Sequence, residues 1–207
     1  MNNFFLFRYG SEILQHTAEH LLLVGLAIAI AVLVGIPLGI VITRHQGLRQ
    51  PILTIANILQ TIPSLALFGL LIPVVGIGAV PAIVALTLYS FLPIIRNTYT
   101  GITQVDPAIR EAGRGMGMTD WQLLTQVELP LAMSVILAGV RVATVIAIGI
   151  ATIAAAIGAG GLGVFIFRGI SVVNDQLILA GAVPAAAIAL IADAGISWLE
   201  RRLSIPS

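Results

Sequence analysis

The chain has 207 residues, of which 58% are hydrophobic and only 9% are charged, and its formal net charge is +1. A soluble domain carries roughly 25% charged residues, so a chain this apolar has too little polar surface to remain dissolved and is expected in a membrane. The small net charge and the dispersed basic residues give no sign of a nucleic-acid partner, and the absence of cysteine excludes disulfides and thiolate metal sites.

The segment before the first long apolar run carries Glu12, His16 and His20, which are spaced four residues apart and share one face of a helix. Histidines at this spacing could hold a metal ion, but the pattern also fits the polar face of an interfacial helix, which we favour. The apolar run that follows lasts about twenty residues, longer than the core of a signal peptide, so we expect it to be retained as a span.

Five apolar runs, each near the roughly 20 residues that cross a bilayer, are continuous rather than alternating, which predicts helices and not a barrel. The sequence therefore predicts an all-α integral membrane protein in which residues 1–207 form a single transmembrane domain. Gly35 and Gly39 in the first run form the G-x-x-x-G pattern of close helix packing. The predicted spans cover about residues 21–42, 52–75, 80–95, 131–157 and 177–199.

The second predicted span carries polar side chains on one helical face, at positions i, i+3, i+4 and i+7. These residues are Asn57, Gln60, Thr61 and Ser64. Polar groups in a span need partners, so this stripe is predicted either to line a translocation pathway, which we favour, or to pack against a second copy of the chain. Pro63 frees a backbone carbonyl beside the stripe and is expected to kink the helix.

Arginines are distributed unequally between the two sides of the predicted spans. Only Arg8 and Arg168 lie on the side of the N-terminus. Because positively charged segments stay in the cytoplasm, the asymmetry predicts an N-terminus outside the cell and a C-terminus in the cytoplasm. The arginines on the predicted cytoplasmic side are Arg44, Arg49, Arg96, Arg110, Arg114, Arg201 and Arg202.

The longest polar segment is the predicted cytoplasmic link at about residues 96–130. Asp106 followed by Pro107 fits a helix N-cap with proline at the first helical position, so a short helix is expected from about Pro107. Gly113, Gly115 and Gly117 are expected to allow close backbone contact and a turn after it.

Arg141 lies inside the fourth predicted span, where an ionisable group is costly and usually faces the bundle interior or a water-filled cavity. Two interpretations stay open: a pathway or gating residue, and a structural arginine. Asp193, the acid well inside a span, is the expected partner of Arg141.

Residues 158–163 read G-A-G-G-L-G and so satisfy the dinucleotide-binding pattern G-x-G-x-x-G. That pattern needs a preceding strand and an acid about 20 residues later, whereas here a membrane helix precedes it and the next acid, Asp175, is too close. The segment is predicted to form a tight turn that folds the outer end of the fourth span back onto its neighbours.

The cytoplasmic link reads Glu111-Ala112-Gly113, three residues, Gly117, nine residues, and then Val127-Glu128-Leu129-Pro130. It resembles the EAA loop of ABC-importer permeases, with Gly113 in place of alanine and Val127 in place of isoleucine. The resemblance implies a short helix that docks in a groove of a cytoplasmic ATPase; the alternative is a solvated connecting loop. The implied coupling residues are Glu111, Ala112, Gly113, Arg114, Gly117 and Pro130.

Residues 55–66, 96–101, 111–118 and 157–163 look like the corresponding stretches of glycine betaine/carnitine/choline permeases, and the similarity runs from about Thr17 to Arg202. It implies a permease fold like that of the methionine importer and the import of a quaternary ammonium osmoprotectant. An importer of another small polar solute, such as an amino acid, is the alternative within this class. A secondary transporter or channel without an ATPase is the alternative outside it.

The sequence contains neither the phosphate-binding motif G-x-x-x-x-G-K-[ST] nor the zinc-protease motif H-E-x-x-H, and no catalytic group can be assembled from it, so it is not expected to be an enzyme. The expected partners are cytoplasmic ABC ATPases that bind ATP and Mg, an extracytoplasmic solute-binding protein, a second permease copy and membrane lipid. No cofactor or metal is expected in this chain. The expected location is a bacterial or archaeal cell (inner) membrane.

Overall fold

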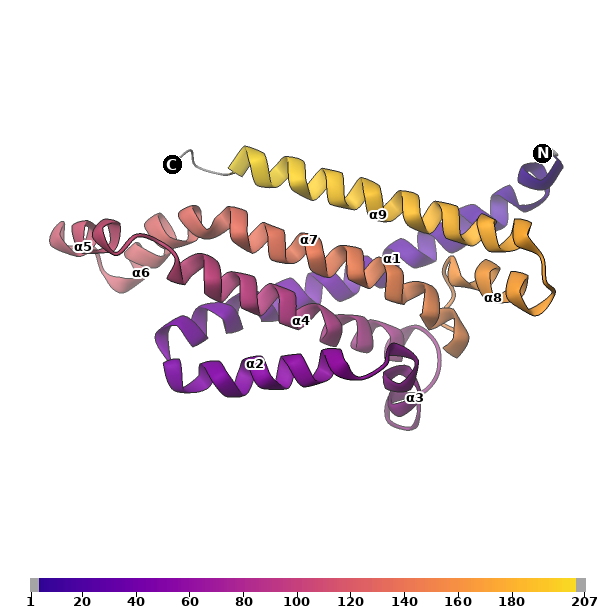
Figure 1. Cartoon of the computed structure of the whole chain (residues 1–207), viewed down its shortest axis with the longest axis horizontal. Coiled ribbons are helices and arrows are strands. Elements are labelled where there is room, and N and C mark those ends of the chain that lie inside the picture. The colour runs from indigo at the N-terminus through magenta and orange to yellow at the C-terminus, as the bar shows by residue number, and fades with distance from the viewer. Residues whose placement is uncertain (1–3, 204–207) are drawn as a thin grey trace.

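The computed structural model describes the backbone of residues 4–203 and the side chains of residues 9–203, so Arg8, which entered the orientation prediction, has no described side chain. The described chain is a bundle of helices joined by short turns (Figure 1). The elements are α1 (Phe4–Arg44), α2 (Gln46–Thr61), α3 (Ser64–Val75), α4 (Ala79–Thr103), α5 (Pro107–Gly115), α6 (Asp120–Leu123), a π-helical turn (Leu124–Glu128), α7 (Leu129–Ile153), a 3-10 turn (Ala154–Ile157), α8 (Gly163–Ser171) and α9 (Asp175–Leu203).

Four helical segments of the described chain are long and apolar enough to cross a membrane, and the pair α2 and α3 provides a fifth crossing if it is counted as one broken span. The predicted all-α membrane fold is confirmed. The four unbroken segments are Tyr9–Arg44, Ala79–Thr103, Asp120–Ile157 and Asp175–Leu203.

The second predicted span is not one continuous helix, so that part of the prediction is wrong. Its two halves meet at 102°, which is a break rather than the expected kink. Pro63 cannot donate a backbone hydrogen bond, and its ring disfavours a helical conformation at the preceding residue. Ile62 is accordingly extended, with φ −69° and ψ 129°.

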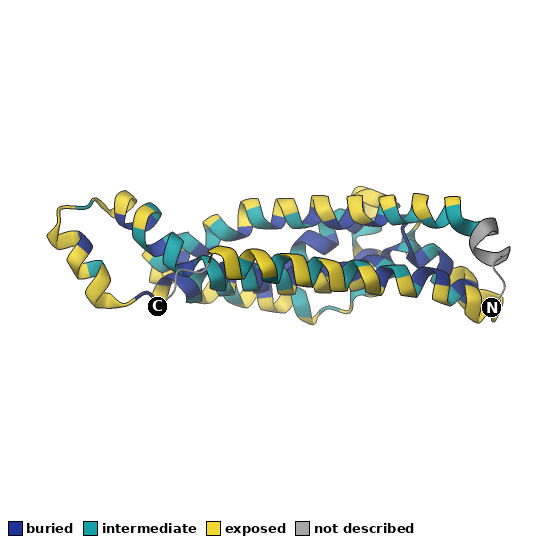
Figure 2. Ribbon diagram, turned by 90° about the horizontal axis from the view of Figure 1, so that it is seen from above, coloured by how far each residue is buried: buried dark blue, intermediate teal, exposed yellow. Residues whose placement is uncertain are grey.

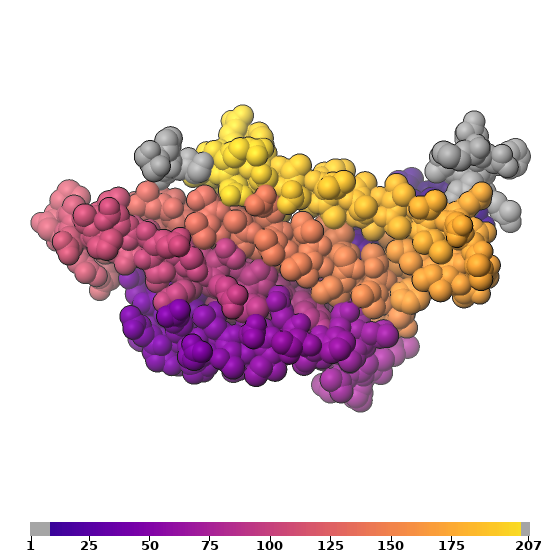
Figure 3. Space-filling view, in the orientation of Figure 1, coloured from indigo at the N-terminus to yellow at the C-terminus, as the bar shows by residue number. Residues whose placement is uncertain are grey.

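Figure 1 shows α1, α4 and α7 packed along the middle of the bundle, with α2 on one side and α9 on the other. Helices α5 and α6 project at one end, next to the end of α9; this end is termed the loop end. The start of α1, with α3 and α8, lies at the opposite end (Figure 1). The space-filling view shows α5 and α6 extending beyond the ends of their neighbours (Figure 3).

Small residues let the central helices approach closely. A Cβ atom added to Gly39 of α1 would lie 2.5 Å from the Cβ of Thr98 on α4, and one added to Gly35 would lie 3.0 Å from Cγ2 of Ile94. The packing predicted from the G-x-x-x-G pattern is therefore confirmed, with α4 as the partner. Gly139 of α7 packs equally closely on Pro93 and Asn97 of α4.

Large apolar side chains are exposed on all the long helices of the bundle. Figure 2 shows that exposed positions recur along these helices. Leu33 is 73% exposed and Leu190 is 72% exposed. Patches of this extent are rare on soluble monomers, but they match a lipid environment or a further subunit.

The first helix differs from the expectation at its start. The predicted interfacial segment and the first span are one continuous helix. His20, which was expected on an exposed polar face, is fully buried in the bundle. Helix α4 also continues to Thr103, well beyond the predicted end near Ile95.

Candidate functional site

Helix α5 forms as the sequence predicts. The Asp106 carboxylate accepts a hydrogen bond from the Ala108 backbone N–H at 2.8 Å, and Pro107 occupies the first turn. Gly113 is buried where a Cβ would lie 2.8 Å from Cδ1 of Leu123, and Gly117 turns the chain with φ +84°. Nothing lies within 4 Å of the Cβ position of Gly115, so close contact there was a wrong expectation.

The outer face of this short helix and of the turn after it is exposed. Glu111, Ala112 and Arg114 are all exposed, and Gly113 is the buried residue that seats α5 on α6. Exposed apolar residues accompany these charges: Ile109 is 44% exposed, Met116 is 76% exposed and Trp121 is 71% exposed. An apolar patch with charged residues around it is the composition of a protein interface.

A buried ion cluster lies directly behind α5, and we term it the Glu128 cluster. The Glu128 side chain is 1% exposed and lies at the start of α7. Arg44, at the end of α1, contacts both of its carboxylate oxygens, with Nη1 3.4 Å from Oε1. Arg110 of α5 places Nε 3.2 Å from Oε1 and also donates from Nη2 to the backbone carbonyl of Ile102. The cluster therefore ties α5 to α1, α4 and α7.

The sequence reasoning missed this cluster, because Glu128 occupies the unspecified position of the EAA-type pattern. The available signal was the position of Glu128, a single acid where the polar link meets an apolar span. A buried carboxylate requires a cation, so its position indicated a partner arginine. Pro130, the last residue of the pattern, lies in the first turn of α7.

A cavity of about 350 Å³ lies at the break between α2 and α3. Gln60, Thr61 and Ser64 of the predicted polar stripe line it from one side. Tyr89 of α4 and Ile146 and Ile150 of α7 line it from the other. The break therefore leaves an open space that polar and apolar side chains line together.

Gln60 and Tyr89 fasten this break through reciprocal hydrogen bonds. Pro93 has no N–H, so it cannot bond to the carbonyl of Tyr89 one turn earlier in α4; the Gln60 side-chain amide donates to that carbonyl at 2.8 Å instead. In return the Tyr89 hydroxyl donates to the Ile62 carbonyl at the break. Gln60 is thus a structural residue as well as a cavity-lining one.

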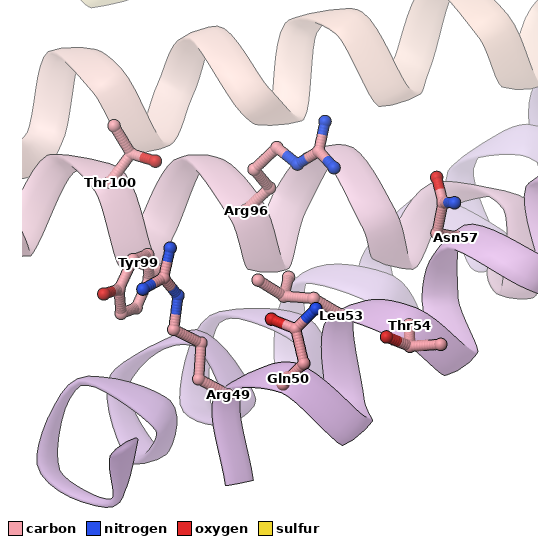
Figure 4. Close-up of a pocket in the computed structure, with 8 residues that line it drawn as sticks. All are labelled: Arg49, Gln50, Leu53, Thr54, Asn57, Arg96, Tyr99 and Thr100. Atoms are coloured by element: carbon pink, nitrogen blue, oxygen red, sulfur yellow. The ribbon is translucent and has the colours of Figure 1, made fainter. Parts of the chain in front are cut away.

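Asn57, the remaining stripe residue, lines a second cavity of about 400 Å³ between α2 and α4, nearer the loop end (Figure 4). We term it the arginine cavity, because Arg49 rises into it from α2 and Arg96 comes from α4 (Figure 4). The Arg49 guanidinium lies 4.6 Å from the ring centroid of Tyr99. Asn57, Gln60 and Thr61 lie on α2, but Ser64 lies on α3 beyond the break, so the expectation of one continuous helical face is wrong. We term the two cavities together the groove, and whether solute passes along it stays a prediction.

Arg141 contacts the predicted partner and a second acid. Its Nη1 lies 3.8 Å from Asp193 Oδ1, and its Nε lies 3.7 Å from Glu200 Oε2, both on α9. Glu200 was not foreseen, because the span that carries it was expected to end near Leu199. Arg141 and Asp193 line neither of the two cavities described above, so the geometry favours a role in holding α7 to α9.

At the opposite end, the glycine-rich segment forms the predicted tight turn. Gly158, Gly160 and Gly161 all have positive φ, and the Gly161 N–H donates to the Glu19 carboxylate at 2.9 Å. Glu19 also contacts His16 Nδ1 at 2.7 Å. The turn thus brings the start of α8 against α1.

Two of the three residues considered for a metal, Glu12 and His16, have other partners. Glu12 accepts from Arg168 of α8 at 3.0 Å, and His16 contacts Glu19. Within residues 9–203, no group of three or more His, Asp or Glu side chains is placed to hold a metal ion.

Residues 31–205 match the family described as the binding-protein-dependent transport system inner membrane component. The chain belongs to this family. The permease shares 48% identity over 194 residues with the osmoprotectant import permease OsmW of Salmonella typhimurium, covering 91% of this chain and 88% of that protein. It shares 51% identity over 196 residues with the glycine betaine/carnitine/choline permease OpuCD of Bacillus subtilis, covering 94% and 86% respectively.

Solved structures agree on the architecture. An inward-facing MetNI methionine ABC transporter chain superposes on the permease with a TM-score of 0.85 at 22% identity, covering 99% of this chain and all of that one. A chain of an amino acid ABC transporter with histidines gives a TM-score of 0.80 at 21% identity, covering 98% and 99% respectively. The predicted methionine-importer-like ABC permease fold is confirmed, and at this identity the likeness concerns the fold alone.

Proposed function

We propose that this permease forms the transmembrane pathway of an ATP-driven importer of osmoprotectants, with a quaternary ammonium compound such as glycine betaine, carnitine or choline as the solute. The observation that carries the proposal is the 48–51% identity to permeases named for these solutes, which extends over more than nine-tenths of the chain. The amino acid importers share the fold at only 21–22% identity, so they support the architecture and not an amino acid as the solute.

The loop end is assigned to the cytoplasm and the start of α1 to the outside. The arginines of the loop end, among them Arg44, Arg110 and Arg114, support this orientation, because positively charged segments remain in the cytoplasm. A solute-binding protein would then deliver solute at the end formed by α3 and α8.

Helix α5 is assigned as the contact for a cytoplasmic ATPase, which binds ATP and Mg. Exposed Glu111 and Arg114 beside Ile109 and Met116 provide the charged and apolar groups of such an interface. A second permease copy, identical or related, completes the pathway by covering the groove along α2.

A displacement of α5 would be transmitted to the groove through contacts between helices. The Glu128 cluster joins α5 to α1 and to the start of α7, and α7 carries Ile146 and Ile150, which line the cavity at the break between α2 and α3. When two ATPases close on ATP, displacement of α5 would shift α7 as a rigid helix and change the opening of the groove.

The test is uptake by the complete transporter in proteoliposomes, after the permease has been coexpressed with its ATPase and its binding protein. Radiolabelled glycine betaine should accumulate only with ATP and binding protein, and Gly117→Trp should reduce both uptake and co-purification of the ATPase. Accumulation without an ATPase would favour a secondary transporter, and stimulation of ATP hydrolysis by an amino acid alone would favour the alternative solute class.

A further inference from the structure

The arginine cavity carries positive charge without a matching acid. Arg49 and Arg96 line it together with neutral residues, and neither guanidinium lies within 4.0 Å of a carboxylate among the residues whose side chains are described. By contrast, Arg44 and Arg110 share Glu128, and Arg141 has two acids within reach. Two unpaired arginines at one cavity favour an anionic group supplied by a ligand.

The geometry leaves these arginines free to donate hydrogen bonds. The Arg49 guanidinium carbon lies over the Tyr99 ring, 4.6 Å from its centroid, and a cation–π contact with the ring face leaves the N–H groups available to an acceptor. Thr54, Asn57 and Thr100 add neutral polar groups around the same space (Figure 4). A planar guanidinium fork is the group that best matches the two oxygens of a carboxylate.

The cavity also lies along the course of the proposed pathway. Asn57 lines it, and Gln60, one turn further along α2, lines the cavity at the break. A solute that leaves the break toward the cytoplasm would therefore meet Arg49 and Arg96 next.

We propose that the arginine cavity binds the carboxylate of a zwitterionic solute on its way into the cytoplasm. This inference rests on the proposed function and narrows its substrate class. Glycine betaine and carnitine carry a carboxylate besides their quaternary ammonium group, whereas choline carries only the positive charge. The two arginines attract the former and repel the latter, so the cavity favours zwitterions over simple cations.

Arginine-selective modification tests binding without relying on transport. The assembled transporter in phosphatidylcholine nanodiscs is treated with phenylglyoxal, and modified residues are located by mass spectrometry. Glycine betaine and acetate should slow modification of Arg49 and Arg96, and choline should not. Arg202 is the matched control, because its guanidinium carbon also lies over an aromatic ring, 4.7 Å from the centroid of Trp198, but on α9 away from the cavity.

Equal protection by choline, or no protection by glycine betaine, would overturn the inference. Protection that appears with anionic lipid in the nanodisc, whatever solute is present, would assign the cavity to a lipid phosphate instead and would likewise overturn it.

Transport supplies a second measurement. Replacing both Arg49 and Arg96 by glutamine should lower glycine betaine uptake by roughly tenfold, the size expected for losing charge-assisted hydrogen bonds, while choline uptake is retained or rises. Arg202→Gln should change neither rate. An equal loss for both solutes would indicate a structural role and contradict the inference. If the unmodified transporter imports neither solute, the proposed function fails, and the protection pattern still decides whether the cavity binds carboxylates.

Discussion

Two regions near the loop end each contain two arginines, yet the regions differ in what balances the charge. In the Glu128 cluster, Arg44 and Arg110 share one fully buried carboxylate. In the arginine cavity, Arg49 and Arg96 lie beside neutral groups, and both side chains are exposed. Arginines that pair with an acid of the same chain fix the relative position of helices, whereas arginines without such an acid are available to a ligand.

Removal of the acid from the Glu128 cluster is expected to have the largest effect. Glu128→Ala leaves two arginines without their partner and should lower the free energy of unfolding by about 3 kcal/mol, the lower end for breaking a buried pair. It should also abolish solute uptake while some ATP hydrolysis persists. Thermal unfolding in detergent, together with the ratio of uptake to hydrolysis, measures both effects.

The matched control is Glu12→Ala, which removes the ion pair between Glu12 Oε1 and Arg168 Nη1. These atoms are 3.0 Å apart, and both side chains are half-exposed. Surface pairs contribute less than about 1 kcal/mol, so this variant should remain near the stability of the unmodified protein. Equal destabilisation by the two substitutions would contradict the distinction between a buried cluster and a surface pair.

The next largest effect is expected at Gly113, the glycine that seats α5 on α6. Gly113→Val places a branched side chain against Leu123 and should displace α5, so that less ATPase co-purifies with the permease. Gly115→Ala, two residues away, meets no atom within 4 Å and should retain the ATPase. If both variants bind the ATPase equally, α5 does not need its packing on α6 to make this contact.

A smaller effect is expected from the hydroxyls of two tyrosines on α4, one at each of the two cavities. Tyr89→Phe removes the donor to the Ile62 carbonyl at the break and should cost about 1 kcal/mol of unfolding free energy, as for one buried hydrogen bond. Tyr99→Phe preserves the ring under Arg49 and should be close to neutral. Denaturation of both variants in one detergent makes the comparison, and a stable Tyr89→Phe protein would show that the break does not depend on this hydrogen bond.

The smallest expected effect is a difference in chemical reactivity. In the absence of solute, phenylglyoxal should modify Arg49 and Arg96 several-fold faster than Arg44 and Arg110, because Glu128 holds the latter pair in ion-pair contact. The order of modification by mass spectrometry tests this expectation. Equal rates for all four would mean that the cluster opens as readily as the cavity.

The sequence predicts those features that depend on neighbouring residues in the chain. Continuous apolar runs predict crossing helices, Asp106-Pro107 predicts α5, and three glycines with positive φ form the turn expected from residues 158–163. Each of these follows from local backbone chemistry.

Features that depend on which helices meet were not predictable in the same way. Arg44 and Glu128 are 84 residues apart, and a helical face indicates that a partner is needed without indicating which helix supplies it. The break at Ile62 was foreseen only as a kink, because its 102° angle depends on Tyr89 and Gln60 stabilising the freed carbonyls across two helices. The arginine cavity likewise exists because α2 lies beside α4.

The exchange of hydrogen bonds at the groove has a consequence for how the family can diverge. Pro93 leaves the Tyr89 carbonyl in α4 without its helical donor, and the Gln60 side chain of α2 donates to that carbonyl. The bend at Pro63 exposes the Ile62 carbonyl, which accepts a hydrogen bond from the Tyr89 hydroxyl. A substitution that adds or removes one of these prolines alone would leave a hydrogen-bonding group without a partner among apolar helices. We therefore expect these four positions to vary as a set among homologues, so that their joint inheritance marks the members of the family in which the second crossing is broken in this way.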